Sequence, residues 1–162
     1  MFEFKPNSDL KKNYDLLQKA IDSHLEDEDN LIANLANIAS FIYTALPDVN
    51  WAGFYLAENG LLILGPFCGK PACVRICFGA GVCGTAAQNG EVVVVPNVHE
   101  FDGHIACDGE TNSEIVLPIF KGGKVFGVLD VDSPILNRFS QTDIEGLTKI
   151  ADSISRYLER LA

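Results

Sequence analysis

Two glycine-containing turns, Asn59-Gly60 and Gly122-Gly123, each separate two segments rich in aliphatic residues. Such dipeptides are typical of two-residue β-hairpin loops, whose central residues take positive φ angles. A loop that short joins only antiparallel neighbours. The sequence therefore predicts two antiparallel hairpins, with strands over 50–57 and 61–67 and over 112–121 and 124–132.

Helical periodicity marks both ends of the chain. Apolar residues recur every three or four positions over 9–25 and over 30–46. We expect Ser8 and Asp29 to cap these two helices. A last helix is predicted to begin after Ser140, whose hydroxyl can accept hydrogen bonds from its first turn.

The segments between the two hairpins are shorter and less regular. Short strands are expected over 74–78 and 92–95, with a two-turn helix over 81–89 that Gly90 ends. Residues 97–111 show no periodicity, and loops of that length are often functional. The pattern indicates an α+β fold: an antiparallel sheet with the N- and C-terminal helices on one face and a ligand pocket under loops on the other.

Length and charge limit the organisation of the chain and its partners. The 162 residues suit a single domain, residues 1–162, and 22 acidic against 12 basic residues give a formal charge of −10. That charge disfavours nucleic acid and anionic membranes. No apolar run approaches the roughly 20 residues that span a bilayer, and the first residues lack the pattern of a signal peptide. We therefore expect a cytoplasmic protein.

Five cysteines stand at positions 68, 73, 77, 83 and 107. A reducing cytosol disfavours permanent disulfides, which leaves buried inert thiols, metal ligands or redox-active thiols. No C-x-x-C pair occurs and no histidine stands at zinc-finger spacing, so we expect no bound metal. Cys68 and Cys77 fall in predicted strands and are expected to be buried and inert. Cys107 falls in the irregular loop near His104, which is either part of a site or a loop histidine bonded to backbone.

The stretch Gly79-Ala80-Gly81-Val82-Cys83-Gly84 matches the dinucleotide-binding pattern G-x-G-x-x-G. That fold also needs a full crossover helix and a second parallel strand, and Gly90 leaves room for only two helical turns. We interpret the stretch as a flexible turn into a short helix, whose N-terminal amides can still bind a carboxylate.

Asp130 and Asp132 lie two residues apart on the last predicted strand, so both side chains point to one face of the sheet. Either the strand end reaches solvent there, or the two carboxyls form a proton-exchanging pair at a pocket mouth, which Glu114 of the neighbouring strand can join. Trp51 and Tyr55 also share a face, and they are either core residues or the wall of a ligand pocket.

Whether Glu114 joins the two aspartates depends on strand register. A regular two-residue turn pairs Lys121 with Lys124 and carries that register to Glu114 opposite Val131. Opposed residues share a face, so Glu114 would then point away from both aspartates.

Two features of the hairpin would instead bring the three acids onto one face. A three-residue loop would pair Phe120 with Lys124, and a bulge near Pro118, which cannot donate to the ladder, would have the same effect. In either case Glu114 would lie opposite Asp130, with the second aspartate diagonal to it. Three such neighbours repel one another, which raises at least one pKa and leaves a proton available.

Three motifs, GKPACVRI, GVCGTAA and GHIACD, together with the WAGFYL and VLDVDSP strands, closely resemble the free methionine-(R)-sulfoxide reductases. The resemblance covers essentially the whole chain and includes Cys73, Cys83 and Cys107 at the family's spacings of ten and twenty-four. Members of this family are single GAF-domain enzymes of the cytosol that act on the free amino acid. Cys68 and Cys77 depart from the usual pattern, so disulfides cannot be assigned by counting thiols.

The resemblance implies a role for each matched residue. Cys107 resembles the nucleophile, Cys73 the resolving thiol, and Cys83 a thiol able to form an alternative disulfide with Cys73. Acidic residues match the side chains that bind the substrate or activate the sulfoxide: Glu114, Asp130 and Asp132. Aromatic residues match the wall near the sulfur and its methyl group: Trp51 and Tyr55.

The expected reaction agrees with the chemistry of these groups. A sulfoxide is a poor electrophile until its oxygen is hydrogen-bonded or protonated, so an acid has to lie beside the attacking thiolate. Attack by Cys107 releases methionine and leaves a sulfenic acid, which a second thiol converts to a disulfide. The resemblance implies no bound cofactor, recycling by thioredoxin with NADPH as indirect electron source, a homodimer and a role in oxidative stress. The alternative is a GAF sensor module that binds a small ligand without chemistry.

Overall fold

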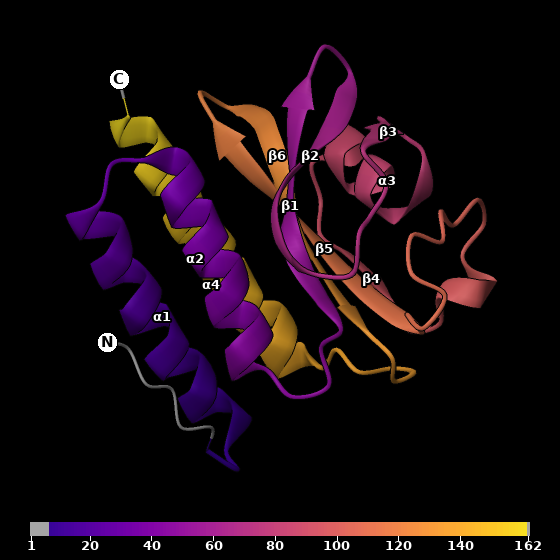
Figure 1. Ribbon diagram of the computed structural model, residues 1–162, viewed down its shortest axis with the longest axis horizontal. Helices are drawn as coiled ribbons and strands as arrows, with labels where there is room; N and C mark the ends of the chain where they lie inside the picture. The colour runs from indigo at the N-terminus through magenta and orange to yellow at the C-terminus, as the bar shows by residue number, and fades with distance from the viewer. Residues whose placement is uncertain (1–6, 162) are drawn as a thin grey trace.

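The structure, a computed structural model, describes residues 7–161. It contains a six-stranded antiparallel sheet in the order β3-β2-β1-β6-β5-β4 (Figure 1). The strands are β1 Trp51–Glu58, β2 Leu61–Gly69, β3 Arg75–Cys77, β4 Val93–Val95, β5 Ser113–Lys121 and β6 Lys124–Ser133. The predicted α+β class and both hairpins are confirmed.

The helices are divided unequally between the two faces of the sheet (Figure 1). They are α1 Leu10–Asp27, α2 Leu31–Ala45, α3 Gly81–Asn89 and α4 Gln141–Arg160, with a short 3-10 helix η1, Val98–Glu100, in the long loop. α2 packs on β1 and β2, α4 packs on β5, and α1 lies outside them. α3 and the long loop lie on the opposite face. Within residues 7–161, no helix is long and apolar enough to cross a membrane.

The N-terminal caps of the first two helices differ from the expectation. Asp9 caps α1 in place of Ser8, and Asn30 caps α2 in place of Asp29. Each helix begins one residue later than its periodicity suggested, so the acceptor that reaches the first turn also lies one residue later. Ser140 caps α4 as predicted, within a capping box.

Both hairpin turns have the backbone that their sequences predict. Asn59 and Gly60 have φ angles of 51° and 79°, and Gly122 and Gly123 have φ angles of 57° and 71°. Positive φ at both central residues is what a two-residue hairpin loop with matching strand twist requires. The strand pairs on either side of these turns are therefore adjacent and antiparallel.

Alternation along the strands divides the apolar residues into two cores. The helix-side core lies between the sheet and α1, α2 and α4, and strand residues such as Phe54, Leu117 and Val131 contribute to it. The pocket-side core lies between the sheet and α3 and includes Trp51 and Tyr55. The sheet therefore turns one face toward the helices and keeps the other for a smaller core beside a cavity.

Candidate active site

The β5–β6 hairpin combines a two-residue turn with a bulge. Lys121 lies opposite Lys124, as the regular turn requires, but Ile119 lies opposite Gly127. Phe126 is therefore one extra residue on β6. An extra residue on one strand reverses the face to which every later side chain on that strand points.

This bulge brings three carboxyl groups onto one face, and we call Glu114, Asp130 and Asp132 the acid cluster. Glu114 lies opposite Asp132, with Asp130 diagonal to it. Of the two expected features, the bulge is present and the three-residue loop is not. The bulge lies close to Pro118, between the pairs formed by Ile119 and Phe120, but its extra residue is on β6, so Glu114 opposes Asp132 rather than Asp130. The extra residue on β6 moves the register by one position in the opposite direction from that expected.

Trp51 and Tyr55 point from β1 toward the same face as the acid cluster. Trp51 lies opposite Asp132 in the β1–β6 ladder. The two aromatic rings stack with centroids 6.0 Å apart and planes at 24°. Both side chains are buried and line a cavity shared with the acids.

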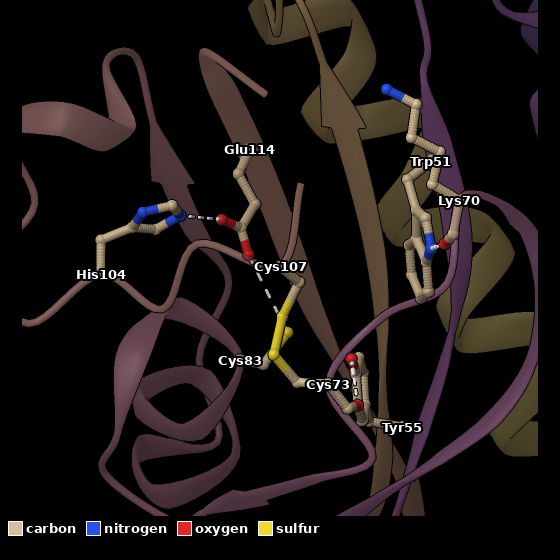
Figure 2. Close-up of a disulfide and its surroundings, with 8 residues drawn as sticks. All are labelled: Trp51, Tyr55, Lys70, Cys73, Cys83, His104, Cys107 and Glu114. Carbon is tan, nitrogen blue, oxygen red and sulfur yellow. Dashed lines mark hydrogen bonds and ion pairs between the residues drawn. A yellow bond between two sulfur atoms is a disulfide. The ribbon is translucent and has the colours of Figure 1, made fainter. Parts of the chain in front are cut away.

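The same two residues hold the segment that follows β2. Trp51 Nε1 donates a hydrogen bond of 3.1 Å to the carbonyl oxygen of Lys70, and the Tyr55 hydroxyl donates one of 2.9 Å to the carbonyl oxygen of Cys73 (Figure 2). Residues 70–73 are thus attached to β1 at both ends.

Cys73 and Cys107 form a disulfide at the cavity, with Cα atoms 5.7 Å apart (Figure 2). The two residues come from segments 34 positions apart in sequence. Cys83, on α3, remains a free and buried thiol with its Sγ 3.9 Å from Oε1 of Glu114. The three cysteines therefore lie together at one site, and the disulfide favours redox-active thiols over inert thiols or metal ligands.

The other two cysteines lie apart from this group. Cys68 is half-buried on β2, whereas Cys77 is exposed on β3. The expectation that both are buried is wrong for Cys77 and is met only in part by Cys68. β3 is an edge strand of three residues in which only Ile76 points inward, so its two neighbours face solvent.

Burial controls the protonation of the acid cluster. It raises the pKa of Glu114, Asp130 and Asp132, and each carboxyl also raises the pKa of a neighbour by repulsion. Burial likewise raises the pKa of the Cys83 thiol, and the nearby carboxyl groups of Asp130 and Glu114 raise it further. Among the described residues, Oδ1 of Asp130 and Oδ1 of Asp132 have no hydrogen-bond partner. These oxygens are free to bind a ligand, and the cluster holds protons that it can donate.

Four further polar residues complete the site: His104, Asn50, Asp108 and Lys70. His104 Nε2 lies 3.5 Å from Oε2 of Glu114, which favours a site residue over a loop histidine bonded to backbone. Asn50 Nδ2 donates to the carboxylate of Asp108, which also pairs with Lys70 Nζ at 3.6 Å. The GHIACD motif contains His104 and Asp108 and the GKPACVRI motif contains Lys70, whereas none of the motifs includes Asn50.

The cavity has a volume of about 510 Å³ with its open mouth included. Its lining comes from β1, β5, β6, α3 and both cysteine-bearing segments. The predicted pocket between the sheet and the middle loops is therefore confirmed.

The glycine-rich stretch does not form a dinucleotide site. It joins β3 to α3, but β3 is antiparallel to β2 and α3 has nine residues, so the parallel crossover unit is not formed. Its interpretation as a turn into a short helix is confirmed. Cys83, Glu114 and Asp130 each place a ligand atom within 4.8 Å of the others, a geometry able to hold a cation. The expectation of no bound metal stays a prediction.

Known proteins are similar to this chain in sequence and fold. The GAF domain family matches residues 30–158. Protein YtsP of Bacillus subtilis is 53% identical over 156 residues, which cover 95% of this chain and 96% of that protein. Free methionine-R-sulfoxide reductase of Escherichia coli is 46% identical over 151 residues, 93% of this chain and 87% of that protein. The crystal structure of free methionine-R-sulfoxide reductase from Neisseria meningitidis in complex with its substrate has a TM-score of 0.93 and 40% identity, covering 98% of this chain and 95% of that chain.

Proposed function

The chain belongs to the GAF domain family, in the group that includes the free methionine-R-sulfoxide reductases, and we propose that it reduces free L-methionine (R)-S-oxide to L-methionine. The main support is the disulfide between Cys73 and Cys107 beside the buried carboxyl of Glu114. A sulfoxide reductase that uses thiols needs an attacking thiol, a second thiol and an acid at one site. We also propose that one GAF domain extends over residues 1–162, since α1 contributes to the helix-side core.

The reduction step begins with both active-site cysteines as thiols. Cys107 attacks the sulfur of the sulfoxide as a thiolate, while a proton from the acid cluster reaches the sulfoxide oxygen. The sulfur–oxygen bond of the substrate breaks, its oxygen passes to the sulfur of Cys107, and methionine leaves. Cys107 is oxidised by two electrons to a sulfenic acid as the sulfoxide sulfur is reduced by two electrons to a thioether.

The enzyme then returns to its starting state through thiol–disulfide chemistry. The Cys73 thiol attacks the sulfenic sulfur of Cys107, water leaves, and the disulfide forms. Cys83 lies at the same cavity and supplies the alternative disulfide with Cys73. We propose thioredoxin as the external dithiol reductant, with NADPH as the indirect electron source and no bound cofactor.

Specificity for the free amino acid is attributed to the walls of the cavity. Trp51 and Tyr55 enclose the sulfur and its methyl group, and the unpartnered oxygens of Asp130 and Asp132 accept hydrogen bonds from polar groups of the substrate. The long loop contributes His104, Cys107 and Asp108 to the cavity wall, and we propose that it encloses the bound amino acid so that no peptide chain can continue from it. We therefore expect no reduction of methionine sulfoxide within proteins.

The proposed setting is a reducing cytoplasm under oxidative stress. Cys77 is a free and exposed cysteine, which suits a reducing compartment better than an oxidising one. A homodimer is proposed from the family resemblance, and light scattering tests it.

One assay separates the enzyme from the alternative GAF sensor module. Reduced protein is mixed with free methionine-(R)-sulfoxide and a dithiol, and methionine is measured by amino-acid analysis. We expect repeated turnover of the R epimer and none of the S epimer or of an oxidised peptide. Binding of the R epimer without release of methionine would identify a sensor module, and efficient reduction of an oxidised protein would contradict the enclosed cavity.

A further inference from the structure

The His104 imidazole contacts the acid cluster from the loop that carries Cys107. Its Nε2 lies 3.5 Å from Oε2 of Glu114, with side-chain exposures of 15% for the histidine and 8% for the glutamate (Figure 2). His104 precedes Cys107 by three residues. One loop therefore positions both the attacking sulfur and the base that contacts the acid.

The proposed reduction step leaves a proton to be accounted for. Cys107 loses a thiol proton when it attacks, and the sulfoxide oxygen gains one proton as its bond to sulfur breaks. If Glu114 supplies the proton to oxygen, its carboxylate has to recover one before the next turnover. The step is balanced when a nearby base takes up the proton that leaves the Cys107 thiol and passes it to the Glu114 carboxylate.

Most neighbours of Glu114 are themselves acids. Titratable groups from every side line this cavity: Cys83 of α3, Asp130 and Asp132 of β6, and Asp108 of the long loop. Cys83, Asp130 and Asp132 have raised pKa values, so they tend to hold their own protons. Burial lowers the pKa of His104, which favours the neutral imidazole, the form with a free ring nitrogen that can take up a proton.

We propose that His104 is a positioning residue for sulfoxide reduction, which holds the carboxyl of Glu114 in place and returns a proton to it after each transfer. The inference rests on the proposed function. Two forms of the pair have the same net charge: neutral imidazole with carboxyl, and imidazolium with carboxylate. The proton therefore moves between them without adding charge to a buried site.

The activity test compares a non-titrating side chain with the wild type. His104→Gln keeps an amide of similar reach but cannot relay a proton, so methionine release after the first turnover should slow by roughly ten-fold or more. The loss of rate should grow toward alkaline pH, where the Glu114 carboxylate is harder to protonate again. Added imidazole should restore part of the rate in His104→Ala. His24→Gln, which alters a half-buried histidine on α1 that contacts Asn37 and lies far from the cavity lining, is the matched control and should behave as wild type.

A second measurement needs no substrate. In reduced protein with ¹³C-labelled histidine and glutamate, the imidazole of His104 and the carboxyl of Glu114 should titrate over the same pH interval. In His104→Gln the carboxyl interval should move. Separate and unlinked titrations would overturn the inference, even if the wild type reduces the sulfoxide.

The remaining outcomes also decide between the proposals. Wild-type rates at every pH in His104→Gln would overturn the inference, and so would a uniform loss without imidazole rescue, which would indicate damage to the loop. Failure of the wild type to release methionine would refute the proposed reductase activity. The nuclear magnetic resonance titration would still decide whether His104 and Glu114 share a proton.

Discussion

The hydroxyl of Tyr55 donates a hydrogen bond of 2.9 Å to the backbone carbonyl oxygen of Cys73. A second bond, from Trp51 Nε1 to the carbonyl oxygen of Lys70, fixes the other end of the same short segment. Neither bond involves the sulfur atoms, so both can hold the segment whether or not the disulfide is present. The aromatic wall of the cavity thus also positions the thiol that is proposed to close the disulfide.

We predict that Tyr55→Phe slows disulfide formation more than methionine release. The variant keeps the ring at the cavity wall but loses one hydrogen bond, worth about 1 kcal/mol, so closure should slow about five-fold. Rapid quenching with thiol alkylation and mass spectrometry measures both steps. Tyr43→Phe on the surface of α2 is the control. Equal slowing of the two steps would show that the hydroxyl does not act through Cys73.

Lys70 forms ion pairs between the segment that carries Cys73 and the loop that carries Cys107. Its ammonium pairs with the carboxylates of Asp108 and Glu110 on the long loop. Lys70→Gln should slow disulfide formation a few-fold, because an exposed pair contributes little, and should reduce its sensitivity to salt. Stopped-flow measurements at low and high salt test this, with Lys149→Gln on α4 as control. Unchanged salt dependence would remove Lys70 from the closure step.

Substitution of the two disulfide-bonded cysteines should separate the halves of the reaction. Cys107→Ser removes the attacking sulfur and should abolish even one equivalent of methionine. Cys73→Ser should release that first equivalent and then lose steady turnover with thioredoxin. A stoichiometric release by Cys107→Ser would refute its assignment. Wild-type recycling by Cys73→Ser would identify Cys83 or another thiol as the resolving residue.

The raised carboxyl pKa values predict a cost to stability at high pH. Burial favours the protonated form of Asp130 in the folded state, so folding is weakened as pH rises from the ordinary aspartate range through the raised pKa. Asp130→Asn should therefore raise Tm by several degrees at mildly alkaline pH and much less at acidic pH. Asp152→Asn, on the exposed face of α4, is the control. The same gain at every pH would mean that ionisation is not its cause.

The local elements could be predicted because their signals are local. Asn59-Gly60 and Gly122-Gly123 specify their turns through backbone angles, and alternation along the strands specifies the faces. Cys77 was placed wrongly because burial at a sheet edge depends on what covers the strand, which a short apolar run does not reveal.

The site was predictable in its composition and less so in its connections. A shared face for Glu114 and the two aspartates required one register irregularity, and the chain contains one. The pairing of Cys73 with Cys107 could be predicted only from the family resemblance, because no periodicity relates segments 34 residues apart. The bond from Tyr55 to Cys73 depends on the path of an irregular segment, for which the sequence carries no periodic signal.

Phe126, the extra residue of the β6 bulge, tests how register builds the acid cluster. Deleting Phe126 leaves a regular two-residue hairpin in which Ile119 still opposes Gly127 and Glu114 still opposes Asp132. Methionine release should therefore stay within a few-fold of the wild type. Thermal melting should show a lower Tm, because the partly buried ring of Phe126 packs against the helix-side core.

The matched control changes the register instead of removing the irregularity. One alanine inserted between Leu129 and Asp130 places Asp130 opposite Ile115, so both aspartates turn toward the apolar helix-side core. Because the two carboxyl groups would be buried there without hydrogen-bond partners, both methionine release and the stability of the fold should decrease. Circular dichroism identifies the variants that fold. An inactive but folded Phe126 deletion would mean that the bulge does more than set the register, and a folded insertion with wild-type release would mean that the acid cluster is not needed on that face.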